Sequence, residues 1–120
     1  MNYKVVIDPG HGGADPGAVN GNIKEKDFTL EVSKYIYDRL KKLGIPVYIT
    51  RNSDETLNRD ERIRRIINAF GNNKNVILLS NHINAGGSDI SNYEGLNLNN
   101  YFCLILSYIN GIRITVIIKL

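Results

Sequence analysis

Three short apolar segments alternate with two longer amphipathic ones, and this order constrains the fold more than any other feature of the chain. Residues 3–7, 46–50 and 76–79 are rich in β-branched and other apolar side chains, which predicts three strands. The connections between them are long enough for right-handed crossovers that each carry a helix. We therefore predict an α/β fold in three layers, with a parallel sheet, mixed at its edge, flanked by helices.

The first helix is predicted from apolar residues that recur at steps of four, four, four and three, and so share one helical face. Asp27 is a natural N-cap residue ahead of this pattern, and Gly44 is a natural terminator behind it. The apolar positions are Phe28, Val32, Ile36, Leu40 and Leu43.

A second amphipathic helix is predicted over residues 57–70, where it stops at Gly71. Its charged run NRDERIRR is most simply interpreted as the solvent-facing side of that helix.

Composition limits the classes of protein that fit. The 120 residues, 42% hydrophobic and 22% charged, suit one domain spanning residues 1–120. The net charge of +3 is spread among acidic residues rather than gathered in a stripe, so we expect no nucleic-acid partner. A mildly positive chain does suit an anionic partner such as a bacterial cell-wall polymer. Oligomeric state cannot be inferred from this sequence.

Cysteine content and hydropathy exclude further possibilities. The single cysteine, Cys103, excludes an internal disulfide and a zinc site built from cysteines. No run reaches the roughly 18 apolar residues of a membrane span. The N-terminus leads directly into a strand, so we expect no signal peptide in this chain.

His11 and His82 are the two histidines of the chain, and each follows a predicted strand. A lone histidine in such a place is usually a surface or hydrogen-bonded residue. The carboxyl ends of parallel strands meet at one edge of a sheet, however, so we expect the two imidazoles to be neighbours. With Glu25, just before the first helix, they would make a three-ligand zinc site with one position open to water. Glu25 alone would be interpreted as a carboxylate favoured by the helix N-terminus.

Other residues of the long first loop have competing interpretations. Asp8 and Asp15 could also bind a cation, but both stand in Asp-Pro-Gly turns, where the side chain normally bonds back to the backbone. The loop glycines could suggest a phosphate cradle, yet the motifs that such sites require are absent. We expect them to let the backbone approach a metal and a substrate closely. These glycines are Gly10, Gly12, Gly13 and Gly17.

Arg51, directly after the second predicted strand, has two interpretations. It could hold a substrate carboxylate at the same sheet edge, or pair with Asp54 or Glu55, which we expect to be its main role.

Four segments together resemble a known family. IDPGHGGADPGAV, KEKDFTL, VYITRNSDETLNRDER and SNHINA are similar in order and spacing to the zinc-dependent N-acetylmuramoyl-L-alanine amidases of type 3, which include cell-wall autolysins and phage endolysins. The resemblance covers residues 3–87. It implies a doubly wound α/β domain with one Zn²⁺ bound by His11, Glu25 and His82. It also implies hydrolysis of the amide between N-acetylmuramic acid and L-alanine in peptidoglycan, outside the cell or in the cell wall after release.

The remaining residues, 88–120, depart from the family. The resemblance implies a second, catalytic glutamate late in the domain, and we find no motif that would carry it here, so we expect the C-terminal part to be missing or divergent relative to the family. Glu94 is the candidate catalytic residue among the later carboxylates, although a loop positions a base poorly. The apolar tail is predicted to form one or two buried strands. A zinc-holding fragment that binds cell-wall peptide without cleaving it is therefore the alternative function.

Overall fold

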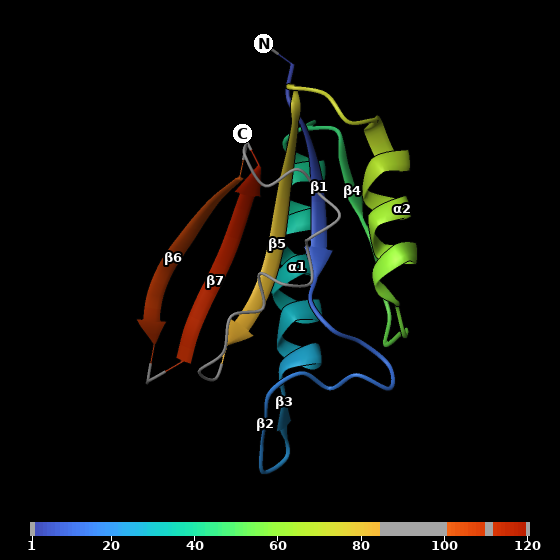
Figure 1. Cartoon of the computed structure of the whole chain (residues 1–120). Coiled ribbons are helices and arrows are strands. Elements are labelled where there is room, and N and C mark those ends of the chain that lie inside the picture. Colours follow the sequence, from blue (N-terminus) through green and yellow to red (C-terminus); the bar gives the residue numbers. More distant parts are fainter. Residues whose placement is uncertain (1, 85–100, 110–111, 120) are drawn as a thin grey trace.

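A mixed five-stranded sheet, with strand order β4-β1-β5-β7-β6, forms the centre of the computed structural model (Figure 1). The structure describes residues 2–84, 101–109 and 112–119. Strands β4, β1 and β5 are parallel, whereas β7 and β6 add antiparallel strands at one side. The predicted parallel sheet with a mixed edge is confirmed. The sheet strands are β1 (Lys4–Pro9), β4 (Val47–Ile49), β5 (Val76–Asn84), β6 (Tyr101–Ile109) and β7 (Ile112–Lys119).

The two helices, α1 (Glu25–Lys42) and α2 (Arg59–Phe70), cover opposite faces of the sheet. Asp8 and Ser80 are register partners whose side chains share one face, and Asp8 pairs there with Arg62 of α2. Asn81, the next residue along β5, points to the other face and donates a 2.7 Å hydrogen bond to Ser33 of α1. The three-layer arrangement that the strand and helix order predicts is therefore confirmed.

The hydrophobic core between the sheet and α2 is small. Val6, Leu78 and Val76 pack there against Ile66 of α2, and all four side chains are buried. Asn58 caps α2 by accepting a 2.9 Å hydrogen bond from the Glu61 amide, so the helix begins two residues later than predicted. It ends before Gly71, as predicted.

The start of α1 corrects the predicted N-cap. Lys24 occupies the cap position without a side-chain bond, and Asp27 lies exposed within the first turn. The amides of Glu25 and Lys26 instead donate to the carbonyls of Ala18 and Pro16, so the preceding loop satisfies the first helical N–H groups.

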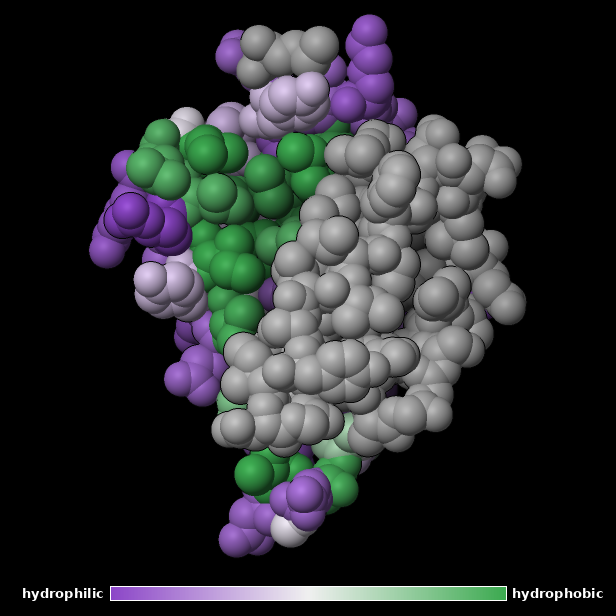
Figure 2. Space-filling view, turned by 90° about the vertical axis from the view of Figure 1, so that its left-hand side faces the viewer, coloured by the Kyte–Doolittle hydropathy of each residue, from purple (hydrophilic) through white to green (hydrophobic). Residues whose placement is uncertain are grey.

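The apolar stripe of α1 does not form its buried face. Phe28 and Val32 are 42% and 43% exposed, and polar residues are buried against the sheet in their place. Figure 2 shows apolar side chains along the side of the molecule that α1 forms, and a second group of apolar side chains at the bottom of the view. The second group corresponds to the hairpin of β2 (Val19–Asn20) and β3 (Ile23–Lys24), which the sequence analysis treated as loop. The buried residues of α1 are Glu25, Lys26, Thr29 and Ser33.

The tail forms two strands, β6 and β7, as predicted, whereas the burial of their side chains is not described. Residues 85–100, including Glu94, lie outside the described residues. Among the described residues, neither helix has the length and apolar character that a bilayer crossing requires.

Candidate metal centre

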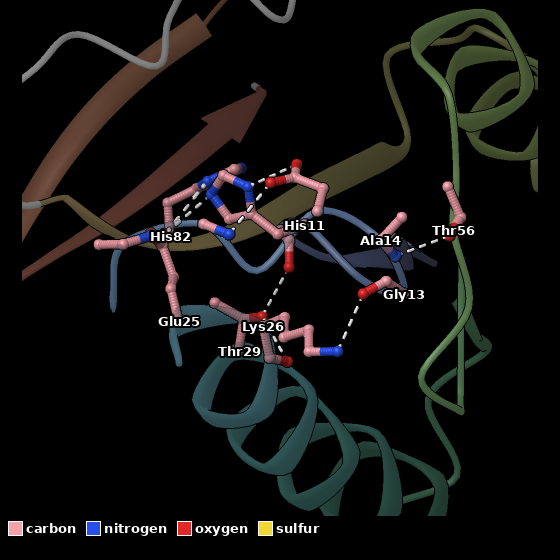
Figure 3. Close-up of polar contacts among 12 residues, drawn as sticks. His11, Gly13, Ala14, Glu25, Lys26, Thr29, Thr56 and His82 are labelled. Carbon is pink, nitrogen blue, oxygen red and sulfur yellow. Dashed lines mark hydrogen bonds and ion pairs between the residues drawn. The ribbon is translucent and has the colours of Figure 1, made fainter. Parts of the chain in front are cut away.

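His11, Glu25 and His82 converge at the carboxyl edge of the parallel strands, as the sequence predicts (Figure 3). One ligand atom from each lies within 4.8 Å of the others. Glu25 Oε1 is 3.2 Å from His11 Nε2 and 3.6 Å from His82 Nδ1. Two nitrogens and one carboxylate oxygen in a buried cluster are a donor set that suits Zn²⁺ with one position left open.

Each of the three candidate ligands comes from a different part of the fold. His11 lies two residues after β1, Glu25 is the first residue of α1, and His82 lies within β5. The predicted end of the third strand was therefore too early, because β5 continues to Asn84. The two imidazole rings meet edge to face, with centroids 5.0 Å apart and planes at 79°.

The carboxylate of Glu25 is fixed by the loop that precedes α1. Its side chain is 2% exposed, and Oε2 accepts a 2.9 Å hydrogen bond from the Ala18 amide. This bond turns Oε1 toward the two imidazoles.

Asp15 orients the imidazole of His11 from the other side. Its Oδ2 lies 2.8 Å from His11 Nδ1, while its Oδ1 accepts the Gly17 amide. The predicted bond back to the backbone is confirmed, but the contact with His11 was not predicted. A carboxylate on one ring nitrogen holds the proton there and directs the other nitrogen at a metal.

The backbone of His11 is left-handed, with φ 60°, which costs a non-glycine residue about 1–3 kcal/mol. The positions of His11 and Glu25 require a glycine at position 17. A Cβ at Gly17 would lie 2.6 Å from His11 Cδ2 and 2.8 Å from Glu25, which is too close for either contact. The expected close approach of glycine backbone to the site is therefore present here.

Electrostatics favour a positive charge between these carboxylates. Burial alone would lower the pKa of His11, but hydrogen bonds and charge interactions with Glu25 and Asp15 outweigh burial and raise this pKa to about 9. Without a metal, His11 is therefore protonated at neutral pH, and a cation at the centre would take the place of that proton.

A sequence model of the family described as N-acetylmuramoyl-L-alanine amidase matches residues 5–98, beyond the end at residue 87 that the sequence analysis expected. The chain belongs to this amidase family.

Several proteins are similar to this chain over most of its length. The germination-specific N-acetylmuramoyl-L-alanine amidase of Bacillus subtilis is 36% identical over 91 residues, which cover 68% of this chain and 38% of that protein. Protein YqiI of the same organism, described as uncharacterized, is 37% identical over 75% of this chain and 42% of its own length. The catalytic domain of the amidase CwlV from Bacillus (Paenibacillus) polymyxa superposes with a TM-score of 0.62 at 34% identity, over 72% of this chain and 48% of that catalytic-domain chain. The chain thus spans less than half the length of these relatives.

Asp8 is placed elsewhere in the amidase fold than the sequence suggested. Its carboxylate is fully buried in β1 and accepts hydrogen bonds from Thr50 Oγ1 at 2.6 Å and Ser80 Oγ at 3.3 Å. Arg62 of α2 donates a further bond of 2.6 Å. Asp8 thus ties strands and helix together through side-chain hydrogen bonds.

Neither interpretation of Arg51 agrees with the structure. Arg51 is 2% exposed, and its guanidinium donates to the carbonyls of Pro9, Gly10, Lys26 and Ser53 and to the Thr29 hydroxyl. The two carboxylates expected to pair with it have other partners, because Asp54 pairs with Lys26 and Glu55 pairs with Arg65. Arg51 therefore stabilises the first loop by binding its backbone carbonyls from a buried position.

Two cationic residues near the centre were missed by the sequence analysis. Lys26 donates to the Gly13 carbonyl at 2.9 Å and to Asp54 at 2.7 Å. Arg62 donates to the His11 carbonyl at 3.0 Å and is 11% exposed in its side chain, so the NRDERIRR run is not wholly a solvent-facing surface. The sequence did contain a signal for Arg62, because this arginine stands one turn into the helix that follows the second strand.

Proposed function

We propose that this chain is a zinc-dependent N-acetylmuramoyl-L-alanine amidase that acts on peptidoglycan. The observation that carries the proposal is the buried convergence of His11, Glu25 and His82 within 4.8 Å, in a chain that belongs to the amidase family. The resemblance of the same three residues to the ligands of that family supports it.

The ligand roles follow from the atoms that face one another. His11 Nε2, His82 Nδ1 and Glu25 Oε1 would hold the ion, with Asp15 behind His11 and the Ala18 amide behind Glu25. When bound, Zn²⁺ polarises a carbonyl and lowers the pKa of a water ligand. Glu94 is the proposed residue that takes a proton and passes it to the leaving amine.

The substrate and its location come from the resemblance. The proposed scissile bond joins the lactyl group of N-acetylmuramic acid to L-alanine, and peptidoglycan lies outside the membrane. The protein would therefore act in the cell wall, and its net charge of +3 suits an anionic wall polymer.

The second candidate function is a fragment that holds zinc and binds cell-wall peptide without cleaving it. The favouring observation is that the match covers only 38% of the germination-specific amidase and 42% of YqiI. His11, Glu25 and His82 lie within residues 5–98, the part of the chain that the family model matches.

Incubation with purified peptidoglycan and Zn²⁺ tests both candidates. The amidase predicts release of free L-alanine amino groups, which a chelator abolishes. Glu25→Gln should remove this release, whereas Glu31→Gln, an exposed position on the same helix, should leave it unchanged. Cosedimentation with the wall without any release would instead support the binding fragment. Neither release nor cosedimentation would contradict both.

A further inference from the structure

We propose that Arg62 of α2 is a positioning residue that holds His11 in its metal-binding conformation. The inference rests on the proposed metal centre and adds to it the helix that sets the geometry of one ligand. Arg62 does not touch the three ligand atoms; it acts through the backbone of His11.

The contacts of Arg62 place its guanidinium between the sheet and the first loop. Nη1 donates to Asp8 Oδ1 at 2.6 Å and to the Pro9 carbonyl at 2.7 Å, and Nη2 donates to the His11 carbonyl at 3.0 Å. One planar group thus reaches both the last residues of β1 and the first ligand. A lysine ammonium lacks this fork geometry and cannot reproduce it.

The sheet itself fixes the position of the guanidinium. Asp8, its ionic partner, is fully buried and also accepts hydrogen bonds from Thr50, the residue after β4, and from Ser80, within β5. Because the side chain of Arg62 is only 11% exposed, its hydrogen bonds compete little with water. The His11 carbonyl is therefore tied to a rigid part of the fold.

His11 is the residue of this loop that most needs such a tie. It is the non-glycine residue with positive φ among those that the structure describes. A left-handed backbone at such a residue persists only where its surroundings hold it. If the carbonyl is released, the backbone can relax toward negative φ, which turns the imidazole away from Glu25 and His82.

Two other buried cations assist in the same way at neighbouring carbonyls. Arg51 donates to Pro9 and Gly10, and Lys26 donates to Gly13. Arg62 is the member of this set that reaches His11, so its loss should affect the metal centre more directly than the loss of a neighbouring arginine.

Helix α2 offers two matched controls. Arg65 is part-buried and donates to Glu55, Glu61 and the Thr50 carbonyl. Arg64 is exposed and pairs with Glu61 within the helix. Substituting either removes one positive charge from α2 without removing the bonds of Arg62 to Asp8 and His11.

The experiment is a Co²⁺ titration of the full chain, followed by the visible absorption of the bound ion and by calorimetry. Arg62→Gln should bind Co²⁺ about 10–100-fold more weakly than the wild type, with an altered ligand-field spectrum. Arg62→Lys, which keeps the charge and the pairing with Asp8, should fall between the two. Arg65→Gln and Arg64→Gln should keep the wild-type affinity and spectrum.

The outcomes separate this inference from the proposed function. A wild type that binds no Co²⁺ would overturn the metal centre and, with it, the role of Arg62. A wild type that binds Co²⁺, with folded Arg62→Gln or Arg62→Lys giving the same affinity and spectrum, would overturn the role of Arg62 alone. Thermal unfolding of each variant identifies any that fails to fold, and Arg62→Lys decides the matter if Arg62→Gln does not fold.

Discussion

The Asp15 carboxylate lies 2.8 Å from Nδ1 of His11, on the opposite side of the imidazole from Glu25. The ring of His11 is therefore held between two carboxylates. Glu25 lies beside Nε2, and Asp15 lies beside Nδ1 on the far side of the ring. This arrangement fixes which nitrogen is presented to an ion, and several consequences can be measured.

Asp15→Asn should weaken Zn²⁺ binding about 10–100-fold, because the substituted amide supports the imidazole less strongly than a carboxylate does. The pKa of His11 in the metal-free protein should also fall, since one of the two groups that raise it is neutralised. Competition with a chromophoric chelator measures the affinity, and NMR titration of the imidazole measures the pKa. Asp38→Asn, an exposed change on α1, serves as the control and should alter neither quantity. Equal affinities for Asp15→Asn and the wild type would refute the orienting role.

The stability of the metal-free chain should decrease as pH rises from about 6.5 to about 9, because folding raises the pKa of His11 from 6.5 to about 9. The protonated imidazole stabilises the fold fully below the lower value, and this contribution is lost as pH passes the upper one. Allowing for solvent screening, it amounts to about 1–3 kcal/mol.

Urea unfolding in the presence of a chelator, at several pH values, measures this loss. The comparison is with His11→Gln, in which this part of the pH dependence should disappear. Parallel pH profiles for the wild type and His11→Gln would show that His11 contributes nothing to the dependence.

Gly17→Ala should disrupt the centre, whereas Gly21→Ala should only strain the backbone. Both glycines have positive φ, 65° and 59°, but a Cβ at Gly17 would meet His11 and Glu25, while one at Gly21 would meet nothing within 4 Å. Gly21→Ala should cost about 1 kcal/mol of unfolding free energy and leave Zn²⁺ affinity unchanged. Gly17→Ala should cost more and lower the affinity. The idea fails if the two variants behave alike in calorimetric titration with Zn²⁺.

Lys26→Met should destabilise the fold by about 1–2 kcal/mol, because the Gly13 carbonyl and the Asp54 carboxylate lose a buried donor. The cost is moderate because Asp54 is exposed and can be solvated once its partner is gone. Chemical unfolding measures it, with the exposed Lys24→Met as control. A loss of equal size in both variants would mean that the bonds from Lys26 contribute nothing specific.

The convergence of His11, Glu25 and His82 could be predicted from the sequence because it depends on topology. His11 lies two residues after β1, and His82 lies in β5 just beyond Asn81, the last residue paired with β1. Parallel strands bring their carboxyl ends to one edge of a sheet. Glu25 could be chosen because it stands where the long loop meets the first helix.

The supporting residues could not be predicted, for a physical reason. Hydrophobic periodicity assigned the buried face of α1 to Phe28 and Val32, yet Thr29 and Ser33 are buried because they bond to Gly10 and Asn81. A polar side chain is buried when a distant segment supplies its partner, and periodicity carries no information about that segment. The same limit explains why Arg62 was interpreted as part of a solvent-facing surface.

X-ray absorption spectroscopy of the zinc-loaded chain tests the central claim most directly. We predict one Zn²⁺ per chain, coordinated by two imidazole nitrogens and carboxylate or water oxygens at about 2.0–2.2 Å, and loss of that ion in His11→Ala and in His82→Ala. A chain that binds no stoichiometric zinc, or a bound zinc whose spectrum lacks imidazole scattering, would contradict it.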